Sequence, residues 1–197
     1  MKLFKNILAG CVLLFATNAS AAIILSAVPG FTDAIPGDSV TIDIVISGLD
    51  AGGPDSLGAF DLDMIYDPGA LSVTGITMGS MLGDFGLGEA LDFSFGDLGG
   101  VVDLAVVSLL FDFELDALQP ADFVLASIDF SVDVLALGTA TEVSLGPLVL
   151  SDAFGFELTP MGVTSAIIAN GVRVSEPGVL ALLAIPLLMM VRRQRKS

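Results

Sequence analysis

Apolar and polar residues alternate along most of the chain between residues 22 and 174, and this period of two limits the fold more than any other feature. The pattern is clearest in Ala59–Tyr66 and in the second half of Phe123–Val134. Successive side chains of a strand point to opposite faces of a sheet, so each such segment has one buried and one solvated face. No long helical period occurs before the C-terminal end. The pattern therefore predicts antiparallel sheets that each keep one wet face, occupied here largely by aspartates.

Turn signals separate about nine of these segments. Glycine and proline mark the breaks, as in Pro36-Gly37-Asp38 and Asp67-Pro68-Gly69. Short strands at this spacing predict an all-β fold, an antiparallel β-sandwich of about nine strands. Residues 79–88 are apolar and glycine-rich without a period, and we expect them to form a loop. The expected strands are Ile23–Ala27, Val40–Ile46, Ala59–Tyr66, Leu71–Met78, Leu91–Phe95, Val101–Phe111, Phe123–Val134, Thr141–Leu150 and Val163–Val174.

The charge of the chain is strongly one-sided. It has 23 Asp and Glu against 7 Lys and Arg, and Arg173 is the only basic residue between positions 22 and 174. Salt bridges therefore cannot hold the domain, so apolar burial and backbone hydrogen bonds must stabilise it. Since no basic patch can form, nucleic acid is excluded as a partner. We expect salt or divalent cations to screen the repulsion between the carboxylates.

Several kinds of active site are excluded by residue type. The chain has no His, and its single Cys is Cys11 near the N-terminus, so neither a Ser-His-Asp triad nor the usual zinc and copper sites can be built. Paired carboxylates remain. Asp61 and Asp63 fall on one strand face, roughly 7 Å apart, and glycosidases use such pairs. Pairs also arise by chance in so acidic a domain. We therefore expect a noncatalytic protein, with a carboxylate-dependent glycoside hydrolase as the less favoured alternative.

Calcium is the cation that these carboxylates suit best, because it takes oxygen ligands from Asp and from backbone carbonyls. The candidate ligands are Asp33, Asp38 and Asp67, which lie in or beside turns. The twelve-residue loop of an EF-hand does not occur. A solvated acidic face is the simpler interpretation of the same residues, and no cofactor other than calcium is expected.

The first 21 residues have the parts of a secretory signal. Lys2 and Lys5 precede the apolar segment 7–16, and Ala19-Ser20-Ala21 is a small-residue cleavage site followed by Ala22. We expect a signal helix that signal peptidase removes between Ala21 and Ala22. The chain is then exported, and a single domain of residues 22–174 follows.

The last 23 residues, 175–197, have three further parts. Ser175-Glu176-Pro177 precedes the apolar run 178–191, and a basic end follows. We expect the run to form a helix, but it is shorter than the ~20 residues that span a bilayer, so it is at most a weak or temporary anchor. The basic end would stay on the cytoplasmic side as a membrane stop. Its charged residues are Arg192, Arg193, Arg195 and Lys196.

This order of tripeptide, apolar run and basic end resembles the PEP-CTERM sorting signal of Gram-negative bacteria. The usual tripeptide is Pro-Glu-Pro, and here Ser175 takes the first position. The resemblance implies recognition at Glu176-Pro177 by an exosortase-type membrane protease. It also implies transient association with the inner membrane, followed by delivery to the cell surface or to an exopolysaccharide matrix.

The middle of the chain resembles a second family, the cohesin domains. The carrying residues are Pro36-Gly37-Asp38, which lead into an early strand, and Tyr66-Asp67-Pro68 before Leu71, Val73 and Gly79. The resemblance implies a jelly-roll sandwich that binds dockerin modules or related partners without catalysis. We expect an exported binding or adhesion module, whose partner is a dockerin-like protein or an exopolysaccharide. The alternative is a structural acidic matrix protein that organises cations and polysaccharide.

Overall fold

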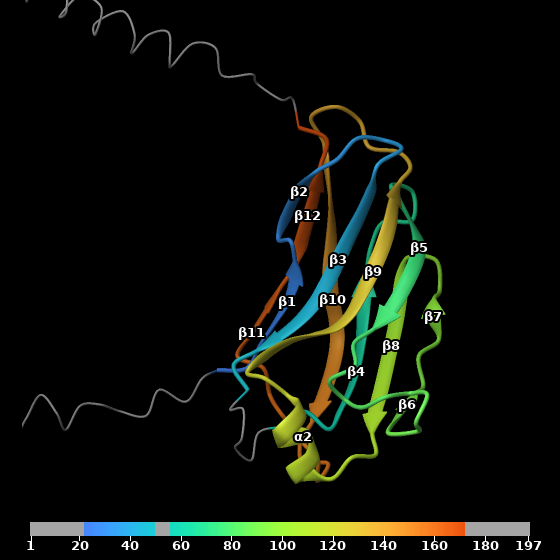
Figure 1. Ribbon diagram of the computed structural model, residues 1–197. Helices are drawn as coiled ribbons and strands as arrows, with labels where there is room; N and C mark the ends of the chain where they lie inside the picture. Colours follow the sequence, from blue (N-terminus) through green and yellow to red (C-terminus); the bar gives the residue numbers. More distant parts are fainter. Residues whose placement is uncertain (1–21, 50–55, 172–197) are drawn as a thin grey trace, which may run out of the picture.

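The computed structural model describes residues 22–49 and 56–171, which form two stacked β-sheets with one short helix, α2, at one end (Figure 1). The described chain ends beyond β12, at the opposite end of the sandwich. The elements are β1 (Ile24–Val28), β2 (Phe31–Asp33), β3 (Ser39–Ser47), β4 (Ala59–Ile65), β5 (Leu71–Met78), β6 (Ala90–Asp92), β7 (Gly96–Asp97), β8 (Val101–Ser108), α2 (Asp112–Leu118), β9 (Asp122–Val132), β10 (Ala140–Ser151), β11 (Gly162–Thr164) and β12 (Ala166–Ala169).

The two sheets are mixed, although most of their strand pairs are antiparallel as predicted. The five-stranded sheet has the order β11-β1-β3-β9-β5, and the seven-stranded sheet has the order β2-β12-β10-β4-β8-β6, with β7 also paired to β8. The pairs β1–β11 and β2–β12 are parallel. The all-β sandwich is thus confirmed, while the purely antiparallel pairing is not. Two crossings explain the difference, because the chain passes between the sheets from β1 to β2 and again from β11 to β12.

The expected strand Val163–Val174 is divided by the second crossing. Ser165 separates β11, which pairs with β1, from β12, which pairs with β10 and β2. The first crossing also contains a short strand, β2, that the sequence did not indicate. The second crossing, Thr164-Ser165-Ala166, has no glycine or proline to mark it, so the sequence did not show where the chain leaves one sheet for the other.

The core lies between the inner faces of the sheets. On β4, Phe60, Leu62 and Met64 point inward and are almost fully buried, while Asp61 is exposed. The same alternation on β3 and β9 buries isoleucine, leucine and phenylalanine opposite them. Apolar burial of about 25 cal/mol per Å² is the main stabilising contribution that this composition leaves. The largest fully buried side chains are Phe130, Leu25, Ile42, Ile44, Ile46, Leu57, Leu62, Met64, Leu71, Leu104, Leu115 and Leu125.

Helix α2 was not predicted, because the expected strand Val101–Phe111 was continued too far. Strand β8 ends at Ser108, and the helix starts after Phe111. The Glu114 carboxylate accepts a hydrogen bond from the Phe111 N–H at 2.9 Å. Asp112 and Glu114 lie in the first turn, where acidic side chains favour the helix dipole. Within the described ranges, no helix has the length and apolar character needed to cross a membrane.

The outer face of the five-stranded sheet carries hydroxyl groups that hydrogen-bond to carboxylates. Thr41 donates to Asp129 at 2.6 Å, and Ser127 donates to Asp43 at 2.6 Å. Ser72 donates to the carboxylate of Asp133. Each pair joins neighbouring strands, so hydroxyl donors on this wet face take the place that lysine or arginine would hold in a less acidic sheet.

Tyr66, the only tyrosine of the chain, joins the end of β4 to β7. Its hydroxyl donates to Asp97 at 2.7 Å, and its ring packs edge-on against Phe130 with centroids 5.3 Å apart. Burial of the phenol raises its pKa above the ordinary 10.0, and the hydrogen bond to Asp97 raises it further. The phenol therefore stays protonated and can donate to Asp97 throughout the neutral pH range.

Gln119 is a buried polar cross-link between three segments. Its Oε1 accepts from the Leu57 N–H at 2.8 Å, and its Nε2 donates to the carbonyls of Leu57 at 2.7 Å and Met81 at 3.0 Å. The side chain is 4% exposed. Gln119 therefore links the end of α2 to the segment before β4 and to the loop after β5. The positions of these three segments depend on one side-chain amide.

We predict that Gln119→Leu lowers the free energy of unfolding by about 2–4 kcal/mol, because it leaves buried N–H and C=O groups of the backbone without partners. Ser39→Ala removes an exposed hydroxyl for which the structure gives no hydrogen bond, and should change stability by less than about 0.5 kcal/mol. Urea unfolding of both variants measures the difference. Equal stability of the two variants would contradict the assigned role of Gln119.

Candidate functional site

The outer face of the seven-stranded sheet is the candidate site, because it is apolar where a solvated face should be polar. Four large side chains point outward from its strands, and a fifth lies directly after β6. Their exposed fractions are 40% for Ile65, 42% for Leu91, 57% for Phe93, 38% for Val107 and 61% for Val149. Scattered exposed apolar residues are common, but a contiguous group usually marks a binding surface. We call these five residues, together with Ala59 and Ala105, the apolar face.

The strand register brings these side chains into rows across the sheet. Ala59 on β4 is paired with Val107 on β8, which is in turn paired with Leu91 on β6. In the next row, Asp61 lies between Val149 on β10 and Ala105 on β8. Paired residues on one face of antiparallel strands are in contact, so the residues of these two rows form one surface. Ile65 lies beyond Asp61 and Asp63, at the end of β4.

Two adjoining hollows lie on this surface. One has a volume of about 230 Å³ and is lined by Asp61, Phe93 and Val149, among others. The other, of about 270 Å³, lies toward α2 and is lined by Leu115 and Phe154. Ala59, Val107 and Ser151 line both hollows, so the concave region continues from the sheet to the helical end.

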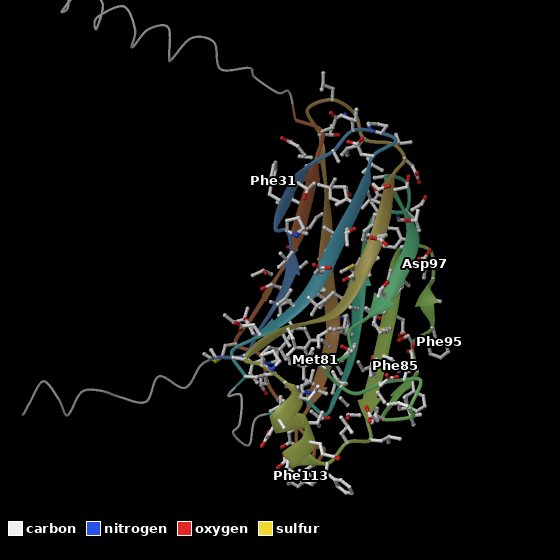
Figure 2. The ribbon with its side chains drawn as sticks, viewed as in Figure 1. Phe31, Met81, Phe85, Phe95, Asp97 and Phe113 are labelled. Carbon is white, nitrogen blue, oxygen red and sulfur yellow. The ribbon has the colours of Figure 1, made fainter. Side chains whose placement is uncertain are left out.

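Exposed aromatic side chains extend the apolar character beyond the sheet. Phe111 and Phe113 stack with ring centroids 5.8 Å apart beside α2. Figure 2 shows Phe113 at the helical end and Phe95 near β7, both pointing away from the sandwich. Their exposed fractions are 69% for Phe113 and 80% for Phe95. The helical end and the region near β7 thus each offer an exposed aromatic side chain to a partner.

A row of carboxylates crosses the apolar face. Asp63 on β4 is directly opposite Asp103 on β8, and Asp61 lies one row away. Asp103 accepts a hydrogen bond from the Phe95 N–H at 2.8 Å. Residues 22–49 and 56–171 contain no Lys, Arg or His, so these acids have no cationic neighbour within the described part of the chain. A partner with both apolar and basic groups would complement this surface.

The bulge in β10 leaves room on the same face. The register of β10 against β4 shifts between Leu145 and Leu148. Pro147 has no N–H to offer the ladder and occurs within this bulge. At Gly146, a Cβ would lie 2.9 Å from Cδ1 of Ile65. A residue larger than glycine would displace Ile65, so this glycine preserves the shape of the apolar face.

The carboxylates proposed for hydrolysis, Asp61 and Asp63, do lie side by side on this face. Asp61 is exposed and Asp63 is half-buried, and both belong to an open sheet surface. A glycosidase needs one carboxyl group held protonated and the other ionised by different environments. Here both side chains share one acidic, solvated surface, an arrangement that does not favour hydrolysis.

The structure brings together two of the three calcium candidates. Asp33 and Asp38 line one hollow at the end of β2, whereas Asp67 lies elsewhere and accepts a hydrogen bond from the Gly69 N–H at 2.9 Å. The part of the chain that the structure describes has no group of three or more Asp, Glu, His or Cys side chains arranged to hold a metal.

The expected processing sites fall outside the described residues, except for Ala22 at the start of the domain. These are the signal-cleavage residues Ala19 and Ala21, the motif Ser175-Glu176-Pro177, and the membrane stop. The apolar face was not predicted from the sequence. A signal for it does exist, because Val106-Val107 and Leu148-Val149-Leu150 place apolar residues on both faces of a strand.

The sequence matches no protein-family model and no curated protein. Solved structures do resemble the fold. A cohesin from Clostridium acetobutylicum, CaCohA2, aligns with a TM-score of 0.60 and 18% identity over 79% of this chain and 94% of that one. The sixth cohesin of scaffoldin B from Acetivibrio cellulolyticus, solved with a Cel5 dockerin, gives 0.57 and 22% over 75% and 98%.

A cohesin from the archaeon Archaeoglobus fulgidus, described as non-cellulosomal, aligns with a TM-score of 0.55 and 17% identity over 80% of this chain and 95% of that one. At such identities the likeness concerns the fold alone. It agrees with the two-sheet topology described above and with the expectation drawn from Pro36-Gly37-Asp38 and Tyr66-Asp67-Pro68. The described domain therefore has a cohesin-like β-sandwich fold.

Proposed function

We propose that this chain is an exported, noncatalytic protein-binding module, and that its partner binds to the apolar face of the seven-stranded sheet. The observation that carries the proposal is the group of exposed apolar side chains, with two adjoining hollows, on the outer face of this sheet. A surface of this kind costs solubility unless a partner covers it.

The structural neighbours support a protein partner. Several of the similar cohesins were solved in complex with a dockerin. A dockerin-like protein is therefore the first candidate for this chain. Its contact surface should combine apolar anchors with lysine or arginine, because Asp61, Asp63 and Asp103 cross the apolar face. Such a surface would gain affinity from apolar burial and specificity from pairing its cations with these three carboxylates.

A structural role in an acidic matrix is the second candidate. The outer face of the five-stranded sheet favours it, since Asp43, Asp129 and Asp133 share that face with many hydroxyl groups. Carboxylates and hydroxyls suit hydrated polysaccharide and divalent cations. Binding to polysaccharide alone, lost in the presence of a chelator, would favour this second role over the adaptor.

The route of export is also a proposal. We infer that signal peptidase removes residues 1–21 and that an exosortase-type protease acts at Glu176-Pro177. The final location would be the cell surface or extracellular matrix of a Gram-negative bacterium. The order of tripeptide, apolar run and basic end supports this proposal.

The partner surface is tested with two aspartate variants and one matched control. The full-length protein is immobilised and exposed to secreted and envelope fractions, and the affinity of the captured protein is then measured. Val107→Asp and Val149→Asp should each weaken binding about tenfold or more, because they add charge to the centre of the apolar face. Val28→Asp adds the same charge at 41% exposure on the other sheet, where Val107 has 38%, and should leave the affinity unchanged.

Comparison with the Val28→Asp control also shows which results would contradict the proposed interface. If all three variants bind the captured partner equally well, the apolar face does not form the interface. If only Val28→Asp weakens binding, the interface lies on the five-stranded sheet. Circular dichroism and a thermal melt of each variant establish that the fold is intact.

For the sorting signal, removal of residues 178–197 should change the final location of the protein in its own cells. The double change Glu176→Ala with Pro177→Ala should keep the apolar run but retain the protein at the inner membrane, because the protease site is lost. Immunoblots of membrane, periplasmic and surface fractions measure both effects. Identical distributions of the wild type and both variants would show that the tail is not a sorting signal.

A further inference from the structure

The chain itself contains a segment with the composition expected of a partner for the apolar face. Five of its seven Lys and Arg lie in residues 172–197, here called the tail, which hold one acidic residue, Glu176. The tail also contains the apolar run 178–191, so apolar and basic groups follow each other directly. The apolar face offers exposed apolar side chains and three carboxylates, and the described residues have no cation. The tail therefore complements this face in both apolar character and charge.

The apolar run is poorly matched to a bilayer. Its 14 residues would give a helix of about 21 Å, whereas the hydrocarbon core of a bilayer is ~30 Å thick. Pro186 also lacks the N–H that a helix would use at this position. In water the run would leave its leucine and methionine side chains exposed. An apolar surface on the same molecule offers a third environment, and contact with it costs no loss of translational freedom.

A second copy of the domain would be a poorer occupant of the same surface. Two apolar faces in contact would bring Asp61, Asp63 and Asp103 of one copy close to the same carboxylates of the other. The described residues contain no Lys, Arg or His that could pair with them. Like charges placed together in an interface cost free energy, so contact between two such faces is disfavoured.

The tail is long enough to reach the apolar face from the end of the described chain. Gly171 lies two residues beyond β12, whose end is paired with the start of the neighbouring strand β10 (Figure 1). Val149 lies nine residues along β10 in the other direction, so it is about 36 Å from Gly171 at ~3.3 Å per residue. Residues 172–177 span about 20 Å when extended, and a helix of residues 178–191 adds about 21 Å. The last turn of the apolar run therefore reaches Val149.

At this reach the basic residues arrive at a carboxylate. Asp61 is paired with Val149 across β4 and β10, so the two side chains are neighbours on one face. Arg192 and Arg193 directly follow the apolar run. A guanidinium group keeps its charge and can bind a carboxylate through two hydrogen bonds. The hollow of about 230 Å³ beside Val149 and Phe93 has room for an aliphatic side chain of the run.

We propose that the tail folds back onto the apolar face of its own domain. Residues 187–191 would lie on Val149, and Arg192 and Arg193 would pair with Asp61. The contact itself requires no partner, whereas its effect on binding rests on the proposed function of this face.

That effect is to hold the partner off until the tail is removed. Cleavage at Glu176-Pro177 would separate the apolar run from the domain and uncover the face. With an effective concentration on the order of 1 mM and a contact that dissociates at about 0.1 mM, the retained tail would weaken partner binding about tenfold. The full-length protein would thus still bind, and the processed protein would bind more tightly.

Disulfide trapping tests the contact without any partner. Cys11, the only cysteine, is replaced by serine in the full-length chain, and Val149→Cys is combined with Leu188→Cys. The host lacks an exosortase-type protease, and the broken-cell extract is oxidised with copper phenanthroline before any detergent is added. Non-reducing gels then separate chains with an internal disulfide from dimers. The internal disulfide should form at least about fivefold more than in a control pair, Val28→Cys with Leu188→Cys, because docking raises the effective concentration of the two thiols.

Val28 makes this control a strict one. Its side chain is 41% exposed on the outer face of the other sheet, where Val149 has 61%. Gly30, two residues further on, accepts a hydrogen bond from the Ile167 N–H at 3.0 Å, so Val28 lies nearer to the end of β12 than Val149 does. A tail that moved at random would meet Val28 at least as often. Equal trapping of the two pairs, or trapping of the Val149 pair only as dimers, would overturn the proposal.

A charge reversal tests the ionic part of the contact. Arg192→Glu with Arg193→Glu should lower the internally linked fraction of the Val149 pair about threefold or more, because like charges then face Asp61. The further changes Asp61→Lys and Asp63→Lys should restore it. An unchanged fraction in the glutamate variant, or a loss that the lysines do not restore, would overturn the assigned pairing. If the lysine variant does not fold, the glutamate variant still decides the question.

The tail contact and the binding function fail in different ways. Removal of residues 178–197 should raise the affinity for the captured partner about tenfold, since the competing contact is lost. Internal trapping without any captured partner would leave the tail contact standing and refute the binding function. Capture with equal affinity by the full-length and shortened chains, together with no internal trapping, would refute the tail contact and leave the binding function standing.

Discussion

The structure depends on burying two apolar sheet faces against each other without any cation to balance its acids. The described residues include no lysine, arginine or histidine, so the folded domain carries its negative charge unpaired. Two kinds of hydrogen bond lower the electrostatic cost of these unpaired carboxylates. Serine and threonine hydroxyls donate to Asp43, Asp129 and Asp133 across neighbouring strands. Backbone N–H groups donate to aspartates in turns, as Gly69 does to Asp67. The core is then free to consist almost wholly of aliphatic and aromatic side chains, as Leu62 and Phe130 show.

The same constraint makes the two outer faces differ. On β3, β5 and β9 of the five-stranded sheet, carboxylates and hydroxyls hydrogen-bond to one another, and that part of the surface is suited to water. On the seven-stranded sheet, Val107, Val149 and Phe93 are exposed beside Asp61 and Asp63, for which no such hydroxyl partners occur among the described residues. A surface that is apolar and acidic at once is complemented by a partner that is apolar and basic. The likeness to cohesins is a likeness of fold alone.

Much of the fold could be predicted from the alternation of residue types. Seven strands of the structure overlap expected segments closely, because their buried apolar side chains recur with a period of two. The predicted strand boundaries were wrong where pairing with distant strands, rather than the local residue pattern, decides the structure. The segment after Gly162 was expected as one strand, yet it is divided between two sheets at Ser165. Helix α2 was missed because it has only seven residues and follows directly on the expected strand Val101–Phe111. The apolar face was missed for a different reason. β8 and β10 carry apolar residues on both faces, which signals an apolar outer surface, but which of the two faces lies toward water is decided by the other sheet.

The central claim is that a protein partner covers the outer face of the seven-stranded sheet. Cross-saturation NMR tests it most directly, with the methyl groups of the full-length protein observed while the protonated partner captured from the envelope fractions is saturated. The account predicts the strongest intensity losses at the methyl groups of Val107, Val149 and Ile65, with little change at Ile24 and Val28 on the opposite sheet. Losses centred on Ile24 and Val28, with Val107 and Val149 unaffected, would contradict it.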